Sequence, residues 1–146
     1  MLFCIKILKD PKKILVIIQR SNGDVFLSYS LIQTLYNYYE SPEIDILVND
    51  DTYEVANLFS NINCIHIFSY LEKRKNRWGQ EKKIFKSLFR KYDLSINLTA
   101  SDRSVFYALI SGKKSISAIE SDISKSWWKK IFLTNYYFSS FSAISF

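Results

Sequence analysis

Apolar residues along this chain alternate between short uninterrupted runs and runs at helical spacing. Residues Lys13–Gln19 enclose five consecutive Ile, Leu and Val residues, which is typical of a strand buried on both faces of a parallel sheet. From Val25 to Tyr39 apolar positions recur at helical spacing, which predicts a helix that Pro42 ends. The polar residues 20–24 lie between these runs, and their single glycine is expected to permit a close turn.

The same alternation continues to residue 118. Further strands are expected at Glu43–Asn49, Cys64–Phe68, Tyr92–Leu98 and Lys114–Ala118. Helices are expected at 50–59, Gln80–Lys91 and Asp102–Ser111, with a loop up to about Trp78 and a helix C-cap at Gly112. This order predicts an α/β fold, a doubly wound parallel sheet with right-handed crossovers.

Length and composition allow one such domain. The chain has 146 residues, 48% of them hydrophobic, with 3 Gly and 2 Pro, which excludes collagen-like, linker-like and disordered classes. We expect this domain to span residues 1–130. Residues 131–146 carry no charge but are too short and too rich in Ser, Thr and Asn for a membrane span, so an interfacial or poorly packed tail is expected there. Residues 1–9 lack the cleavage site of a signal peptide.

The charge of the chain favours a negatively charged partner. Lys and Arg outnumber Asp and Glu by 20 to 14, and nine of these cations lie between Lys73 and Lys91. Nucleic acid, anionic lipid and a phosphorylated substrate are all compatible with this charge. A solvated helix face is the ordinary explanation of such a run. Because no nucleic-acid recognition motif accompanies it, we expect no nucleic-acid partner.

Cysteine and histidine positions predict neither a metal site nor a disulfide. Cys4 and Cys64 have no CxxC spacing, and His66 is the only histidine of the chain. This usage is typical of a reduced, cytoplasmic protein. His66 lies within a predicted strand, so we expect a buried or edge histidine with a hydrogen-bond partner rather than a catalytic one.

Candidate chemistry is expected where the strands end. In a doubly wound sheet, ligands bind at the carboxyl ends of the strands near the reversal of strand order, which selects the loops 20–24, 49–52 and 99–103. The first loop has neither GxGxxG nor GxxxxGK[ST]. Asp24, at a helix start, suits either proton acceptance from a bound hydroxyl or an N-cap.

The loop after the fourth predicted strand offers a second set of polar groups. Arg103 could bind an anion, and Ser101 and Ser104 could donate hydrogen bonds to sugar hydroxyls or phosphate oxygens. The alternatives are a surface ion pair for Arg103 and a helix cap at Ser101 or Asp102.

Four segments in register resemble glycosyltransferase family 9, the lipopolysaccharide heptosyltransferases. Residues 14–35, with their Arg-Ser-Asn-Gly-Asp turn, resemble the opening of that family. Glu43–Val48, Lys91–Thr99 and Asp102–Lys113 resemble its second strand, its fourth strand and its Arg-Ser helix in that order. Arg20 and the Asn-Leu-Thr sequence are most similar to the heptosyltransferase III branch. The resemblance covers residues 13–130.

This resemblance implies a fold, a reaction and roles for named residues. The chain would be the Rossmann-like N-terminal half of a GT-B enzyme that transfers heptose, with inversion, from ADP-heptose to the lipopolysaccharide inner core. No metal or other cofactor is implied. Asp24 would be the general base. The acceptor side would be formed by Arg20, Ser21, Asn22, Gly23, Arg103 and Ser104, of which the last two could instead shape the cleft.

The sequence also departs from the family. The Lys or Arg usual near the end of the first strand is Ile18 or Gln19 here, and a usual Gly is missing within 115–118. The donor-binding second domain is not found in the 146 residues, so activity is expected to need a separately encoded half. The setting implied is the cytoplasmic side of the inner membrane, with the protein peripheral to the anionic inner leaflet. A non-catalytic remnant or acceptor-binding module is the alternative.

Overall fold

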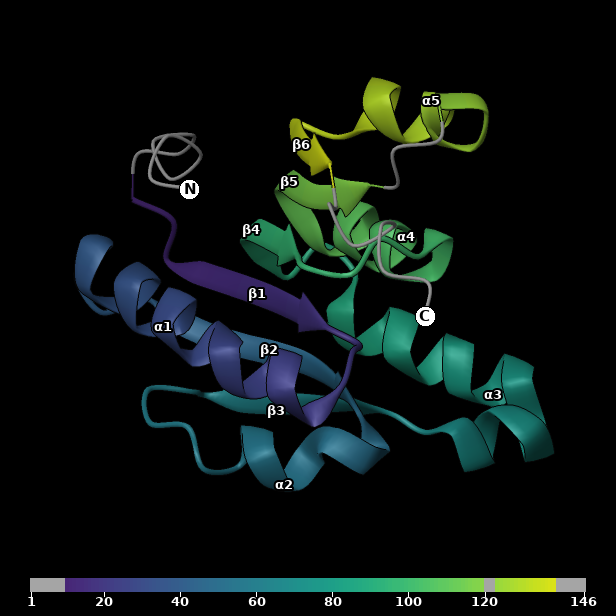
Figure 1. The fold of residues 1–146 in the computed structure, drawn as a ribbon, viewed down its shortest axis with the longest axis horizontal. Coiled ribbons are helices and arrows are strands. Elements are labelled where there is room, and N and C mark those ends of the chain that lie inside the picture. Colours follow the sequence, from purple (N-terminus) through teal and green to yellow (C-terminus); the bar gives the residue numbers. More distant parts are fainter. Residues whose placement is uncertain (1–9, 120–122, 139–146) are drawn as a thin grey trace, which may run out of the picture.

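The computed structural model describes residues 10–119 and 123–138 (Figure 1). The strands are β1 Lys13–Ile18, β2 Glu43–Asn49, β3 Cys64–Phe68, β4 Tyr92–Asn97, β5 Gly112–Ile119 and β6 Asn135–Phe138. The helices are α1 Asn22–Tyr38, α2 Tyr53–Ala56, α3 Tyr70–Leu88, α4 Asp102–Ser111 and α5 Ile123–Phe132, with a 3₁₀ turn at Asp50–Thr52. Expectations for residues 1–9, including Cys4, and for residues 139–146 of the predicted tail lie outside the described residues.

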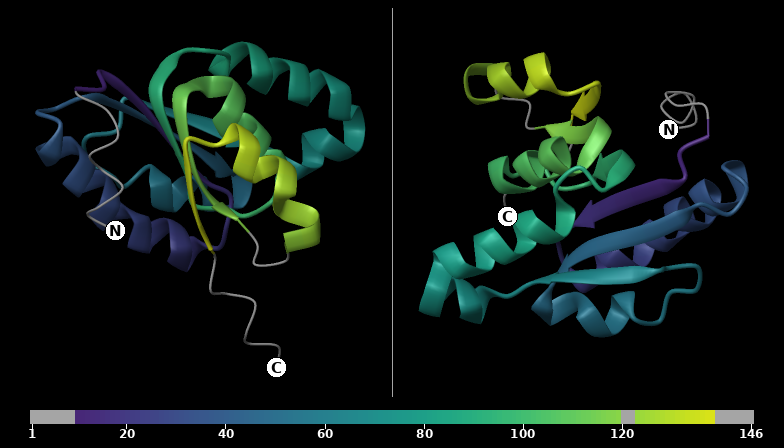
Figure 2. Two further views of the ribbon diagram at one scale, coloured as in Figure 1. Left: turned by 90° about the horizontal axis from the view of Figure 1, so that it is seen from above. Right: turned by 180° about the vertical axis from the view of Figure 1, so that it is seen from behind.

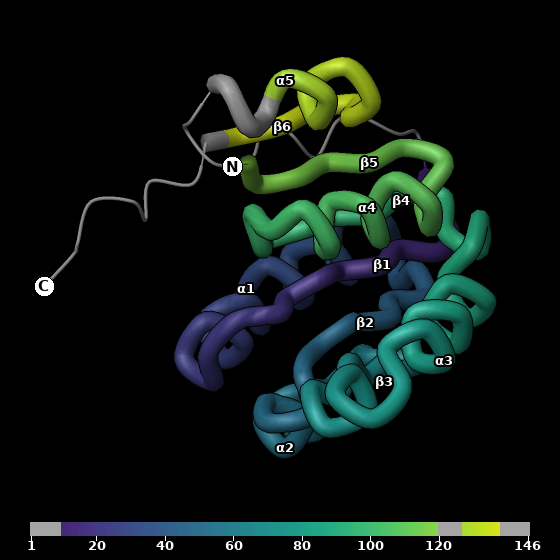
Figure 3. Tube along the Cα trace, turned by 90° about the vertical axis from the view of Figure 1, so that its right-hand side faces the viewer, coloured from purple at the N-terminus to yellow at the C-terminus, as the bar shows by residue number. Residues whose placement is uncertain are grey.

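All six strands pair in parallel in the order β3-β2-β1-β4-β5-β6 (Figure 3). Strand β1 lies in the middle of the sheet, β2 and β3 follow outward from it on one side, and β4 pairs with its other side. Strand order therefore reverses between β1 and β4, as in doubly wound nucleotide-binding folds. The predicted fold class is confirmed.

The helices form a layer on each face of the sheet. Figure 2 shows α1 and α2 on one side and α3 and α4 on the other. In β1, Ile14, Val16 and Ile18 pack with the α1 side, whereas Leu15 and Ile17 pack with α3 and α4. All five are at most 1% exposed. The uninterrupted apolar run is thus explained by burial on both faces, at about 1.5–3 kcal/mol for each side chain.

Two helices begin earlier than their apolar periodicity predicts. Helix α1 starts at Asn22 because the side chain of Ser21 caps it. Helix α3 starts at Tyr70, where the Ser69 side chain accepts a hydrogen bond from the amide of Glu72. The prediction of a loop before Trp78 is therefore wrong. Both caps use serine, which satisfies helix amide groups that have no partner within the helix.

A break at Asn76 divides α3 into two helical segments. The backbone there is non-helical, with φ −150° and ψ 79°, and the Asn76 Oδ1 atom accepts a hydrogen bond from the amide of Gly79 at 2.9 Å. Asn76 thus caps the second segment with its side chain.

Helix α2 ends at Ala56 rather than at the predicted residue 59.

The region predicted as a tail from residue 131 contributes to the sheet. Strand β6 pairs with β5 through Ile116↔Asn135 and the three following pairs, and Leu133 packs against α4 beside Trp128. Lys129 is 1% exposed, and its Nζ lies 2.7 Å from Asp102 Oδ1 and 3.3 Å from the Ala100 carbonyl oxygen. This lysine therefore joins α5 to the start of α4.

Among the described residues, no helix combines the length and the apolar character that crossing a bilayer requires.

In the ion pair between Asp102 and Lys129 only the lysine is buried. We therefore expect mutation of the two residues to change stability by different amounts. Asp102 is 77% exposed and Lys129 is buried. We expect Asp102→Ala to lower the free energy of unfolding by about 1–2 kcal/mol, because a buried ammonium loses its carboxylate. Lys129→Met keeps the apolar stem and removes the buried charge, so stability should stay within about 1 kcal/mol of the parent. Urea unfolding measures both.

The exposed Asp51 supplies the control. Asp51→Ala should change the free energy of unfolding by less than about 0.5 kcal/mol. A larger loss for Lys129→Met than for Asp102→Ala would contradict this account.

Candidate functional site

The loops selected from the sequence follow β1, β2 and β4, and therefore share the carboxyl edge of the sheet. Two hydrogen bonds join the carboxyl ends of β1 and β4, next to the first and third loops, across the reversal of strand order. The amide of Gln19 donates to Thr99 Oγ1 at 2.9 Å, and the amide of Leu98 donates to the Ile17 carbonyl oxygen at 2.9 Å. The prediction that these loops lie at one edge is confirmed.

Asp24 is the third residue of α1 and is held by two donors. Its Oδ2 accepts from Ser21 Oγ at 2.9 Å and from Arg20 Nε at 3.1 Å. The amide of Asp24 in turn donates to Ser21 Oγ at 3.4 Å. The interpretation of Asp24 as the N-cap is therefore wrong, because Ser21 is the cap.

The surroundings of Asp24 favour its ionised form. Partial burial raises the pKa of Asp24, but the hydrogen bonds from Ser21 and Arg20 and the Arg20 charge lower it more, so the net pKa lies below its ordinary value. The positive end of the α1 dipole acts in the same direction. The carboxylate can accept a proton at neutral pH, but it is a weak base while Arg20 is bound to it.

Gly23 does not form the close turn that was expected between the first strand and the first helix. Among the described residues no glycine has positive φ, and Gly23 lies within the first turn of α1. A Cβ added there would meet only Ser21 Oγ, at 3.9 Å. Ser21, Asn22 and Gly23 are all exposed, so this turn presents open backbone at the sheet edge.

Unpaired buried polar atoms mark the same edge. Those with no hydrogen-bond partner among the described residues are Gln19 Nε2 and Oε1, Asn49 Oδ1, Gln80 Nε2 and Arg103 Nε. Gln19 and Asn49 end β1 and β2, and Gln80 accepts from the Ser69 amide just beyond β3, at 2.8 Å. Buried polar groups are nearly always paired. Their concentration here points to a binding site for water or a polar ligand.

Arg103 crosses the carboxyl edge toward β3. Its guanidinium carbon lies 3.9 Å from the centroid of the Phe68 ring and 6.0 Å from that of Tyr70. No ion pair of Arg103 is found within residues 10–119 and 123–138, so the surface ion pair is not its observed role there. Stacking on Phe68 fixes the plane of the guanidinium, which is the group that suits bidentate binding of an anion.

Ser104 lies in a buried network under the loop. It is 0% exposed, and its hydroxyl accepts from Asn97 Nδ2 at 3.1 Å and donates to the Thr99 carbonyl oxygen at 2.8 Å. Ser101 is the N-cap of α4, as one of the sequence alternatives predicted. Ser104 thus shapes the turn instead of presenting its hydroxyl at the surface.

Asn97 is the centre of this network. Its Nδ2 also donates to the Thr99 carbonyl oxygen at 2.6 Å and to Ser117 Oγ at 2.8 Å, and its Oδ1 accepts from the Thr99 amide at 3.0 Å. One 0%-exposed side chain therefore ties β4 to β5 and to the loop that precedes Arg103.

Three residues of this edge had no predicted role in the site: Gln19, Phe68 and Gln80. Asn49 was predicted only as the first residue of the loop 49–52. A polar residue that directly ends a buried apolar run was an available signal for Gln19 and Asn49. Phe68 and Gln80 had no local signal, because their roles come from contacts with Arg103 and Ser69.

The predicted partner of His66 exists: its Nε2 is 2.9 Å from the Tyr92 hydroxyl oxygen.

No family model and no curated protein matches the chain, but solved structures do. A family 9 glycosyl transferase from Veillonella parvula matches with TM-score 0.71 and 19% identity over 86% of this chain and 35% of that chain. E. coli heptosyltransferase WaaC with ADP-2-deoxy-2-fluoro heptose matches with TM-score 0.68 and 12% identity over 86% and 42%. E. coli ADP-heptose LPS heptosyltransferase II matches with TM-score 0.62 and 19% identity over 85% and 34%.

These matches bear on the fold. The chain has the α/β fold of one half of a GT-B heptosyltransferase, so the structural resemblance to family 9 is confirmed. The chain spans between 34% and 42% of the length of the three proteins.

The Asn97 network predicts a large stability effect at one residue. Asn97→Ala removes the side-chain hydrogen bonds to Thr99, Ser104 and Ser117 at a fully buried position, so we expect the free energy of unfolding to fall by about 2–4 kcal/mol. Urea unfolding with an unchanged m-value measures this loss. Asn37→Ala, at an exposed position of α1, should stay within about 0.5 kcal/mol of the parent. Equal effects of the two substitutions would contradict the role given to Asn97.

Proposed function

We propose that this chain is the acceptor-side, N-terminal domain of a family 9 heptosyltransferase. The reaction would transfer heptose from ADP-heptose to the lipopolysaccharide core, and the donor would bind to the second half of the GT-B fold. The observation that carries the proposal is the Asp24 carboxylate at the start of α1, held by Ser21 and Arg20 at the sheet edge where unpaired polar atoms lie, in a fold that matches heptosyltransferases.

In the proposed reaction, Asp24 acts as the general base. The acceptor hydroxyl gives its proton to the carboxylate while its oxygen bonds to the anomeric carbon of the heptose. The bond from that carbon to the ADP phosphate oxygen breaks, and ADP leaves with the electron pair. One such displacement inverts the anomeric configuration. Arg103, held on Phe68, and the exposed Ser21, Asn22 and Gly23 would orient the acceptor.

Arg20 has two uses in this scheme. It neutralises Asp24 in the observed structure, and its guanidinium suits an anionic group of the acceptor. An acceptor that draws Arg20 away would leave Asp24 a stronger base at the moment when a hydroxyl is present.

The basic surface of α3 supports a membrane-associated setting. The segment from Leu71 to Trp78, which spans the break at Asn76, carries Lys73, Arg74, Lys75 and Arg77. It exposes Leu71 and Trp78 at 66% and 83%. This segment follows the carboxyl end of β3, so it borders the candidate site. Near an anionic leaflet each cation contributes about 1 kcal/mol. We therefore place the protein on the cytoplasmic face of the inner membrane.

An acceptor-binding module without catalysis is the second candidate function. The contact between Arg20 and Asp24, which makes the carboxylate a weak base, favours it. Specific binding of truncated lipopolysaccharide, without ADP release in the presence of a donor half, would select this function.

The base assignment predicts a rate effect. Asp24→Asn should reduce the release of ADP from ADP-heptose by about 10²–10⁴-fold, measured with truncated lipopolysaccharide and the donor half. Asp10→Asn, an exposed carboxylate that precedes β1, should leave the rate unchanged. Unchanged turnover in Asp24→Asn would remove Asp24 from the mechanism.

The Arg20 contact predicts a pH effect. The base form of Asp24 exists above its lowered pKa, so kcat/KM should fall as the pH falls through that value. Arg20→Gln removes a hydrogen bond and a charge that lower the pKa, so the acidic limb of the profile should move to higher pH. Arg103→Gln should raise KM and leave the limb in place. An unmoved limb in Arg20→Gln would show that Asp24 is not the titrating base.

A further inference from the structure

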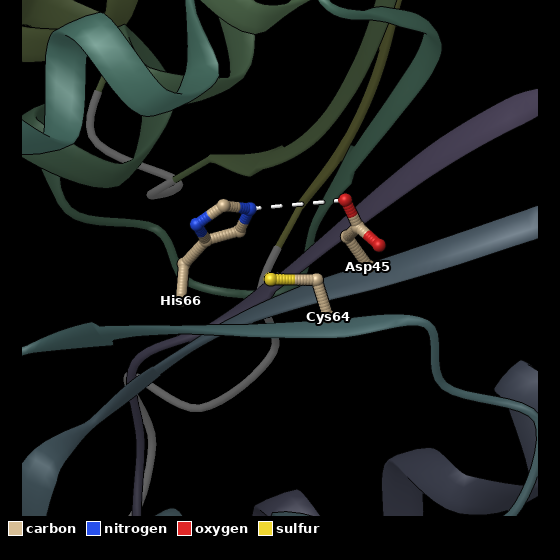
Figure 4. A group of neighbouring side chains, drawn as sticks. All are labelled: Asp45, Cys64 and His66. Atoms are coloured by element: carbon tan, nitrogen blue, oxygen red, sulfur yellow. Dashed lines mark ion pairs between the residues drawn. The ribbon is translucent and has the colours of Figure 1, made fainter.

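Three side chains of metal-ligating types lie close together near the amino end of the sheet, away from the candidate site. They are Asp45 of β2 and Cys64 and His66 of β3 (Figure 4). Their ligand atoms all lie within 4.8 Å of one another. Asp45 is the register partner of Cys64, and His66 follows two residues later, so all three lie on one face of the sheet.

The donor set suits zinc. Zinc in proteins is bound by cysteine sulfur, histidine nitrogen and carboxylate oxygen, and sites with three protein ligands keep water in the fourth position. The Asp45 and His66 side chains are 14% and 17% exposed, whereas Cys64 is exposed. Two ligands are therefore held within the protein, and the third lies where an ion would enter.

The carboxylate of Asp45 is already oriented. Tyr92 donates its hydroxyl to Asp45 Oδ2 at 2.6 Å, and Asn63 Nδ2 donates to Oδ1 at 3.0 Å. Contacts of this kind typically hold metal ligands in place. His66 Nε2 lies 2.9 Å from the Tyr92 hydroxyl oxygen and 3.8 Å from Asp45 Oδ2. When His66 Nε2 binds a metal ion, its hydrogen bond with the Tyr92 hydroxyl is replaced by the bond to the ion.

Charge balance also favours a divalent ion. A carboxylate, a thiolate and a neutral imidazole sum to two negative charges. The Cys64 thiol gives its proton to solvent as the sulfur–zinc bond forms.

We propose that Asp45, Cys64 and His66 bind one zinc ion, with water completing the coordination. The ion links β2 to β3 and, through Tyr92, to β4. Because the site lies away from the carboxyl edge, it stabilises the sheet and takes no part in the proposed sugar transfer. The sequence analysis predicted no metal, because the third ligand comes from a different strand and is brought in by register.

Zinc titration of the chelator-stripped, reduced full chain tests this proposal. We expect one zinc ion per chain by calorimetry, a higher Tm with zinc, and a thiolate-to-cobalt charge-transfer band when cobalt(II) is the probe. Cys64→Ser should abolish the band and weaken zinc binding by at least about tenfold. Cys4→Ser is the matched control, because it removes the other thiol of the chain and should keep both signals.

His66→Gln gives a second measure with both cysteines present, and it should also weaken zinc binding by at least about tenfold. Circular dichroism reports whether each variant is folded, and the exposed position of Cys64 favours a folded Cys64→Ser. The proposal is overturned if the parent binds no zinc at micromolar concentration. It is equally overturned if Cys64→Ser binds as tightly as the parent, or if only Cys4→Ser loses the cobalt band.

Discussion

The pairing of β1 with β4 is the constraint on which the rest of the structure depends. It runs from Ile14↔Leu94 to Ile17↔Asn97 and joins the half of the sheet built before α3 to the half built after it. Both faces of β1 are buried, so this strand also anchors the two helical layers. The same pairing brings the turn that holds Asp24 beside the loop that leads to Arg103. Without it, the candidate site would be divided between two separate units.

The strands pack through apolar side chains, whereas the carboxyl edge of the sheet is held together by polar contacts. The Asn97 side chain is fully paired, and this makes the loop before α4 rigid. Gln19 and Asn49 are buried at the same edge with unpaired atoms. An unpaired buried polar group costs about 1–3 kcal/mol, and a ligand that pairs these atoms recovers that energy. A rigid frame next to unpaired groups is the arrangement that a binding site needs.

The strands could be predicted from the sequence because burial on two faces leaves a local signal. The runs around Val16 and Ile46 are apolar without alternation, and β1 to β5 lie where expected. Helix starts were missed because Ser21 and Ser69 precede the apolar periodicity. Strand β6 was missed because its Asn-Tyr-Tyr-Phe sequence has no uninterrupted branched run. The stacking of Arg103 and the cluster around Asp45 depend on register and packing between distant segments, which no local pattern records.

Arg20 links binding to chemistry in the proposed reaction. One guanidinium cannot give its full charge both to the Asp24 carboxylate and to an anion on the acceptor. While it pairs with Asp24, the carboxylate is a weak base, so the empty site is poorly suited to deprotonate water. When an acceptor anion competes for Arg20, the basicity of Asp24 rises with the acceptor hydroxyl in place. Recognition of the acceptor charge and activation of its hydroxyl are then parts of one electrostatic exchange.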